Sequence, residues 1–520
     1  MKKTNYVKII NKENRKYQLK KATAFLQMKL TVGKKREQKK NAYSIYQHSF
    51  DFDRYKNNLP EQYYFKPTDI IIYDLIRKED LSKAKKGLVK LYKKCYSHKF
   101  LGISKSEEDI DKIIQDLDQT LYSVDSWYST SLFDFAYNDS MDSYIQYFDI
   151  RFHNFSSSYV AVEMRIALSD DFISDISEFI KKPYKKSGME IRRTWGRNKK
   201  QSGAQIMYCV SPGALSEYAK SQLLYEQIQH IKQIYLHEMT KYLPLMQYTK
   251  NKKIASINVF ETNITPSLQL DKSVYTALGL DEMYGFYFSL AERLYTSTTT
   301  ISRITEPESD MMFVYNAKLI TDYHMYGSAH NYVLEHLTMD YMDELYRVVI
   351  LNELGRSYWN LISEYRNKIN VCKTNRRQHK ILLKLKYQLN QDFYDFKKID
   401  EELPVDAKLD RAEKILSSNE YVKLSTFLGV HTYEQFTDVP RRSWMHIRSN
   451  YAEVANDLNL KLEISDSLAK YTSERKNRIM VFVQVILAAA TFFFLLFPSK
   501  AEAIANLIKR AWSCLGSLFQ

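Results

Sequence analysis

The sequence predicts an α+β cytosolic domain followed by an all-α helical stalk and one C-terminal transmembrane helix. Three observations support this fold class: partial alternation of apolar and polar residues before residue 337, helical spacing of apolar residues from 338 to 478, and an uncharged apolar run at 479–497. With 45% hydrophobic residues the 520-residue chain can bury sizeable cores. Only 13 glycines argue against architectures rich in tight turns or glycine-rich phosphate loops.

These patterns divide the chain into five predicted parts. They are a basic N-terminal arm (1–45), an α+β cytosolic domain (46–337), a helical hairpin or stalk (338–478), a transmembrane helix (479–497) and an amphipathic interfacial tail (498–520).

The predicted cytosolic domain contains a β-hairpin followed by a capped helix. Segments 144–155 and 159–168 partly alternate apolar and polar residues, and three serines separate them. Ser169 follows as a helix N-cap, with acidic residues in the first turn that suit the positive end of the helix dipole. Further expected elements are short strands at 256–260 and 311–315, and helices at 107–122 and 215–243.

The predicted stalk begins with a long helix over 339–371, where apolar residues alternate spacings of three and four. A basic break at 373–380 separates it from a second helix over 382–403, which ends at Pro404, so the pair should form an antiparallel hairpin. We expect further helices at 407–428 and from the region 444–458. Because 465–478 contains neither Gly nor Pro, the last helix should run unbroken into the span.

The run 479–497 predicts the membrane span. Its nineteen residues carry no charge, and a helix of that length covers about 28 Å, close to the thickness of a bilayer's hydrocarbon core. Basic residues and Pro498 flank the run. After it, one stripe of apolar residues in 501–519 predicts an amphipathic helix in the far interface, or one packed on a neighbouring subunit.

The sequence also predicts where the large N-terminal part lies. Its N-terminus carries basic residues without a following apolar stretch, so we expect no signal peptide and a cytoplasmic location at a cell membrane crossed once. The four cysteines are widely separated and form no CxxC pair, which indicates a reducing compartment.

Within the span, Gln484, Ala488 and Thr491 share one helix face. Two hydrogen-bonding side chains around a small one suit a helix–helix contact, so we expect a homo-oligomer formed through this face. The alternative is that one Gln and one Thr are simply tolerated among lipid.

The net charge of +15 is concentrated in two segments. Residues 1–40 carry fourteen Lys or Arg against two Glu, and residues 181–200 carry nine against one. The second segment is a candidate anion-binding site for anionic lipid or nucleic acid, although solvated charge is an equally open reading. Its residues are Lys181, Lys182, Lys185, Lys186, Arg192, Arg193, Arg197, Lys199 and Lys200.

Motifs for chemistry are few. The sequence has no GxxxxGK[ST] and no GxGxxG, so we expect no nucleotide cofactor and assign no catalytic residue. His324, His330 and His336 are candidate metal ligands with acidic neighbours, but their spacing of six does not place them on one helix face. Scattered surface histidines are the competing interpretation.

A mixed cytosolic domain, long helices, the basic segment ERKNR and then a C-terminal span resemble the architecture of CorA-like metal-ion transporters. The resemblance covers about the last 140 residues, and it implies ion conduction across the membrane. That family carries Gly-Met-Asn after its first span, whereas this chain reads PSKAEA and has no second apolar run. No filter residue is therefore carried over.

Three functional hypotheses follow. The first is a cytosolic sensor or adaptor anchored in the membrane; the second is a membrane-perturbing or channel-like effector, with a role in cell defence; the third is an enzyme of unrecognised type. The lipid bilayer and a second copy of the chain are the expected partners.

Overall fold

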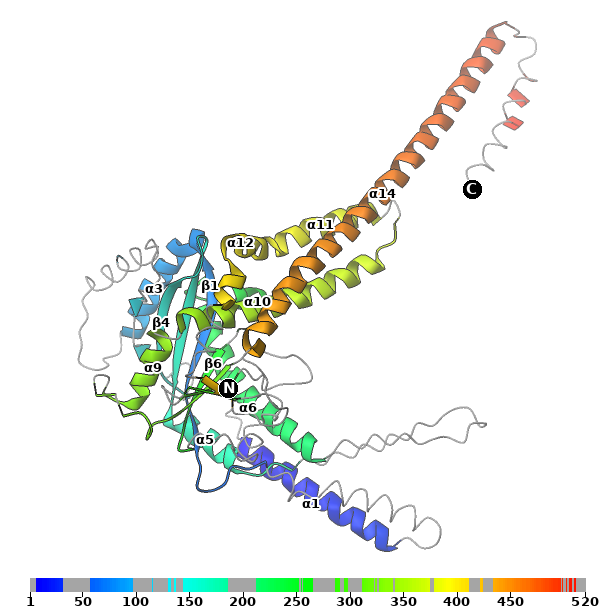
Figure 1. Ribbon diagram of the computed structural model, residues 1–520. Coiled ribbons are helices and arrows are strands. Elements are labelled where there is room, and N and C mark those ends of the chain that lie inside the picture. Colours follow the sequence, from blue (N-terminus) through cyan, green and yellow to red (C-terminus); the bar gives the residue numbers. More distant parts are fainter. Residues whose placement is uncertain are drawn as a thin grey trace. The chain divides into compact units, whose positions relative to one another are not determined.

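The computed structural model is shown in Figure 1. It describes residues 6–30, 57–96, 144–185, 212–251, 254, 256–264, 311–321, 323–324, 327–339, 342–374, 378–410 and 434–496, five short strands, and a few single positions elsewhere. The chain divides into two compact units. The sheet unit comprises residues 1–358 and 395–445, and the stalk unit comprises residues 359–394 and 446–520.

The described part of the sheet unit contains a mixed ten-stranded sheet. Five strands form its middle, in the spatial order β9 (Met311–Asn316), β6 (Ser256–Thr262), β1 (Phe65–Arg77), β5 (Tyr159–Leu168) and β4 (Ile145–Asn154). Strands β6 and β9 pair in parallel. The remaining neighbouring pairs, β6–β1, β1–β5 and β5–β4, are antiparallel. The outer strands are β2 (Thr130–Ser131), β3 (Phe135–Ala136), β7 (Phe286–Ser289), β8 (Leu294–Ser297) and β10 (Tyr421–Lys423).

One face of this sheet forms the apolar core. Ile70, Ile72 and Ile76 of β1 point to this face together with apolar residues of β4 and β5. Three helices supply the opposite layer: α3 (Leu81–Tyr96), α5 (Asp170–Lys181) and α6 (Pro212–Met239). The short helices η2 (Lys78–Asp80) and α7 (Met246–Asn251) complete this part, and α1 (Tyr6–Leu30) contributes Ile10 to the same core.

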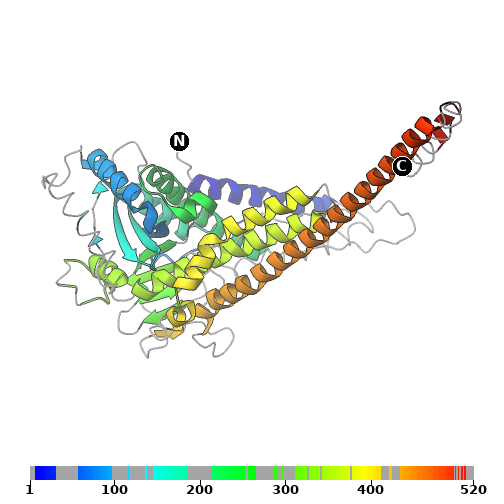
Figure 2. The same cartoon turned by 90° about the horizontal axis from the view of Figure 1, so that it is seen from above.

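The other face of the sheet carries polar side chains and is covered by different helices. These are α9 (Ala329–Met339), the first half of α10 (Met342–Val371) and α12 (Tyr394–Glu402). Tyr346 of α10 stacks on Tyr73 of β1, and Arg77 forms a two-fold hydrogen bond with Asp395. Figure 2 shows the sheet with helices on both sides, so its polar residues are enclosed rather than open to solvent.

The stalk unit consists of three helical segments: α10 from Trp359 onward, α11 (His379–Asp392), and α14 (Glu434–Leu496) from His446 onward. Buried apolar residues hold them together: Ile362, Tyr365, Ile369, Leu382, Leu385, Leu389, Val454, Leu458 and Leu462. Lys461 of α14 donates to the carbonyls of Ile369 and Cys372, 2.6 and 3.1 Å away, and so caps the end of α10. This bundle anchors the first part of α14 only.

Most elements confirm the sequence predictions. The hairpin of β4 and β5 forms, and the Ser169 hydroxyl accepts a hydrogen bond from the Phe172 N–H at the start of α5. The predicted strands at 256–260 and 311–315 are β6 and β9, and the helix at 215–243 is α6. The antiparallel pair of α10 and α11 also forms, with the Tyr365 hydroxyl 2.6 Å from Asp392. The second helix, predicted as one helix over 382–403, is instead divided at Phe393 into α11 and α12.

The prediction for residues 407–428 is also wrong. The expected helix over 407–428 does not extend that far, because Tyr421–Lys423 forms strand β10, which pairs with β7. Helical spacing could not reveal this pairing, since the partner strand lies more than 130 residues earlier in the chain. The predicted helix over 107–122 and the amphipathic tail fall almost wholly outside the described residues.

Candidate functional site

The C-terminal half of α14 is the candidate membrane segment. The helix runs without a break from Glu434 to Leu496, as the absence of Gly and Pro in 465–478 predicts. Its apolar window has the length and composition to cross a membrane, and none of that window is buried against the rest of the chain. Phe482 is 57% exposed and Leu495 is 78% exposed. This exposure distinguishes the segment from the core helix of a soluble protein, whose apolar residues are covered.

The predicted association face lies within this segment. Gln484, Ala488 and Thr491 are all exposed on α14. The Thr491 hydroxyl donates to the Leu487 carbonyl of its own helix at 2.8 Å. Its donor is therefore occupied, and the Gln484 amide is the stronger candidate for a hydrogen bond to a second copy.

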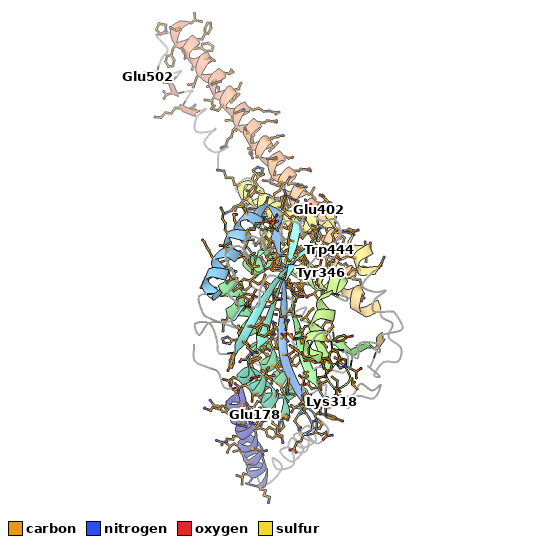
Figure 3. The ribbon with its side chains drawn as sticks, turned by 90° about the vertical axis from the view of Figure 1, so that its left-hand side faces the viewer. Glu178, Lys318, Tyr346, Glu402, Trp444 and Glu502 are labelled. Carbon is orange, nitrogen blue, oxygen red and sulfur yellow. The ribbon has the colours of Figure 1, made fainter. Side chains whose placement is uncertain are left out.

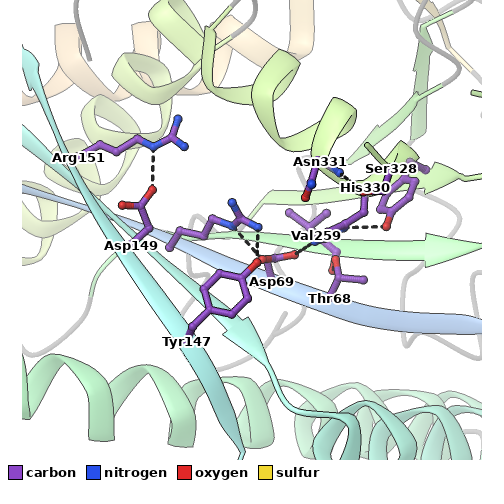
Figure 4. Close-up of polar contacts among 11 residues, drawn as sticks. Thr68, Asp69, Tyr147, Asp149, Arg151, Val259, Ser328, His330 and Asn331 are labelled. Atoms are coloured by element: carbon purple, nitrogen blue, oxygen red, sulfur yellow. Dashed lines mark hydrogen bonds and ion pairs between the residues drawn. The ribbon is translucent and has the colours of Figure 1, made fainter. Parts of the chain in front are cut away.

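A second candidate region is the buried polar network on the sheet (Figure 4). Oδ1 of Asp69 on β1 accepts a hydrogen bond from the Arg165 Nε–H at 2.9 Å. Its other oxygen, Oδ2, lies 3.2 Å from Nε2 of His330. The Tyr315 hydroxyl lies 2.9 Å from the His330 Nδ1, and the Tyr147 hydroxyl accepts from Arg165 at 3.0 Å. Four strands and α9 thus contribute five polar side chains, each of which contacts the next, to one connected network.

The geometry defines the charge state of this network. Burial opposes ionisation of Asp69, but the hydrogen bonds and charges of His330 and Arg165 outweigh it and lower the pKa of that carboxyl. Burial raises the pKa of the Tyr315 hydroxyl, so this group stays protonated and can donate to His330. In this arrangement the Tyr315 hydroxyl occupies Nδ1 of His330, and Nε2 faces the Asp69 carboxylate.

A second pair of polar contacts lies further along the same face. The His153 Nε2 lies 3.0 Å from Glu163, whose pKa is lowered because this hydrogen bond and nearby positive charge outweigh the effect of burial. The Tyr346 ring stacks on the His153 ring, and Arg151 donates to Asp149 at 2.9 Å. All of these groups are buried, so the network stabilises the packing of helices on this face.

The three predicted metal-ligand histidines do not come together as a described site. His330 belongs to the Asp69 network, and His324 is exposed beside the Tyr323 ring. The His336 side chain lies outside the described residues. Among the residues that the structure describes, no three His, Cys, Asp or Glu side chains are placed to hold a metal ion.

The candidate anion-binding segment is described only at its start. Lys181, Lys182 and Lys185 lie where the chain leaves α5, and the remaining six basic residues fall outside the described part. The buried Lys220 side-chain nitrogen of α6 fixes this exit by donating to the carbonyls of Ile180 at 2.8 Å and Lys182 at 3.0 Å. These contacts set the position from which the basic segment begins.

Sequence reasoning missed two groups that shape these sites. Asp69 and Asp74 lie in the apolar run of β1, which carries no alternating pattern and was not predicted as a strand. Asp74 accepts the backbone N–H groups of Leu75, Gln247 and Tyr248 at 2.6, 2.7 and 3.0 Å. An acidic residue inside an otherwise apolar run is the signal that could have indicated a buried, fully bonded carboxylate.

No family model, no curated protein and no solved structure matches this chain. The resemblance to CorA-like transporters therefore stays an expectation from the sequence.

Proposed function

We propose that the chain is a membrane-anchored cytosolic sensor or adaptor that acts as an oligomer. The observation that carries this proposal is the fully exposed apolar segment at the end of α14. Burying one large apolar side chain stabilises by about 1.5–3 kcal/mol, so exposing this run to water would cost on the order of 20 kcal/mol. A lipid bilayer removes that cost, and the basic residues Arg475, Lys476 and Arg478 suit its headgroup region.

The sheet unit supports an adaptor role over catalysis. The described polar network on its sheet lies largely buried beneath α9, α10 and α12, and His330 within it lies against both Tyr315 and Asp69. A buried and mutually bonded network holds helices on a sheet, and helices held in this way form a stable surface for a partner.

Membrane fractionation tests the anchor. Full-length chain should stay in the pellet after alkaline carbonate extraction, while a variant that lacks residues 479–520 should move to the supernatant. Protease added to inverted membrane vesicles should digest the sheet unit, and protease added to intact cells should not. Full-length chain in the supernatant without detergent would overturn the proposal.

The effector alternative makes a different prediction about the membrane itself. Induced cells would leak a small dye, and deletion of residues 479–520 would abolish that leak. An adaptor leaves the permeability barrier intact when it is expressed at the same level.

A further inference from the structure

The two basic regions of the sequence meet in the fold. The Asn14 side chain on α1 donates to the Pro183 carbonyl at 2.9 Å and accepts the Lys185 N–H at 2.7 Å. Tyr184, between these two residues, is bound by the Asn57 side chain. The Asn57 side-chain NH₂ donates to the Tyr184 carbonyl at 2.8 Å, and the Asn57 Oδ1 accepts the Tyr184 N–H at 3.0 Å. Figure 3 shows Glu178 of α5 beside α1. The start of the 181–200 segment therefore lies against α1.

Helix α1 turns one face inward and a basic face outward. Ile10 and Tyr17 are fully buried, which fixes the inward side of the helix. At 100° per residue, the opposite side carries a run of exposed side chains. In chain order these are Lys8, Lys12, Arg15, Lys16, Leu19 and Leu26.

The composition of this outward face indicates the kind of partner. Residues 6–30 contain seven Lys or Arg and one acidic residue, Glu13, so the face attracts anions. Leu19 is 69% exposed and Leu26 is 54% exposed, and both lie on the same side as the basic residues. A phosphodiester backbone offers no apolar partner for two leucines, whereas a lipid surface offers phosphate headgroups above an acyl layer.

We infer that the outward face of α1 docks on the surface of an anionic bilayer. Lys12, Arg15 and Lys16 lie at the headgroups, and Leu19 and Leu26 enter the boundary with the acyl chains. The inference rests on the proposed membrane anchor only because the anchor keeps the sheet unit near such a surface.

Vesicle binding by anchored protein tests this contact separately from the span. Full-length chain is held in nanodiscs of phosphatidylcholine, so the span is already occupied, and sucrose-loaded vesicles are then added and sedimented. Vesicles with about one-third phosphatidylglycerol should sediment the nanodiscs, and pure phosphatidylcholine vesicles should not. The triple variant Lys12→Gln/Arg15→Gln/Lys16→Gln should lose roughly 100-fold in apparent affinity, because each basic residue near an anionic surface contributes about tenfold or less.

A matched control makes the same change in charge at three exposed lysines of another helix. Lys380→Gln/Lys384→Gln/Lys386→Gln on α11 should bind phosphatidylglycerol vesicles as the wild type does. Leu19→Asn/Leu26→Asn should weaken binding at least about fivefold, since two side chains no longer enter the acyl boundary. Equal loss in the control triple, unchanged binding of the leucine variant, or equal binding to both vesicle types would overturn the inference.

A duplex oligonucleotide of about 30 base pairs provides the competing outcome. Tight duplex binding that the α1 triple variant loses and the leucine variant keeps, without binding to anionic vesicles, would assign the surface to nucleic acid and overturn the lipid contact. Failure of the anchor is recognised separately, since the chain would then not be retained in nanodiscs, and its binding to anionic vesicles could still be measured as free protein.

Discussion

Asp74 is a carboxyl group whose burial works against its ionisation. It is fully buried on the core face of β1, and although three backbone N–H groups point to it, burial dominates and raises its pKa to about 7. A raised pKa means that the folded state holds this proton more tightly than the unfolded chain does, whose Asp titrates near 4. Stability should therefore fall as pH rises from about 4 to about 7.

We predict that Asp74→Asn removes this pH dependence. Asn cannot ionise, so the thermal midpoint of the variant should change little between pH 5 and pH 8, while that of the wild type should drop. At pH 5 the variant should be less stable by about 1–3 kcal/mol, because its amide NH₂ replaces one acceptor of backbone N–H groups. Circular dichroism melts of the detergent-purified chain measure both effects. Parallel pH profiles for the two proteins would contradict the assignment.

Asp69 has the opposite linkage. Its lowered pKa means that its contribution to stability is present above about pH 4 and is lost as the pH falls below that value. We predict that Asp69→Asn destabilises the sheet unit by about 3–5 kcal/mol at pH 7, because Arg165 would stay buried without its carboxylate. Hydrogen exchange of peptides from β1 and β5 should report this loss. Exchange protection equal to that of the wild type would show that the ion pair contributes little.

At the scale of the elements, α3 closely approaches the segment after α6. A Cβ atom added at Gly87 would lie 1.7 Å from the Tyr242 carbonyl oxygen, so no side chain fits without movement of the backbone. We predict that Gly87→Ala destabilises the sheet unit by about 3 kcal/mol or more, despite the higher helix propensity of Ala. The neighbouring exposed position provides the control, since Lys86→Ala should be nearly neutral. A thermal midpoint for Gly87→Ala at or above that of Lys86→Ala would rule out the close contact.

The sequence predicted those elements whose signals are local. The serine turn, the alternation in β4 and β5 and the Ser169 cap depend on neighbouring residues, and all three form as expected. Strand β1 was missed because it is buried on both faces and its central part, IIIYDLI, is apolar apart from Asp74 and so shows no alternation. Its partners, β5 and β6, begin about 90 and 190 residues away, so only the folded chain reveals the pairing.

On the scale of the whole molecule, the candidate sites differ in how well the sequence indicates them. The span needs only composition and length, and the structure agrees that the segment is apolar, helical and exposed. The Asp69 network joins residues up to 261 positions apart, and no spacing rule connects Asp69 with His330. The junction of the two basic regions likewise depends on Asn14 contacting residues about 170 positions later.

Self-association through the span is the prediction that joins these parts into a functional assembly. Gln484→Leu should weaken the oligomer more than Thr491→Val, because the Thr491 donor is already used within its own helix. An interhelical hydrogen bond in a membrane contributes about 0.6–2 kcal/mol, which corresponds to a roughly 3- to 30-fold change in the dissociation constant. Förster transfer between labelled chains diluted in lipid measures this change directly.

The control lies on another side of the same helix. Val485→Leu changes a lipid-exposed position without removing a polar group, so the oligomer should persist. If Gln484→Leu and Val485→Leu give the same dissociation constant as the wild type, the polar face carries no contact. An adaptor that forms oligomers needs at least one surface that contacts a second copy, so association would then have to come from elsewhere. The exposed residues Leu460, Ile464 and Leu468 of α14 in the stalk unit offer such a surface.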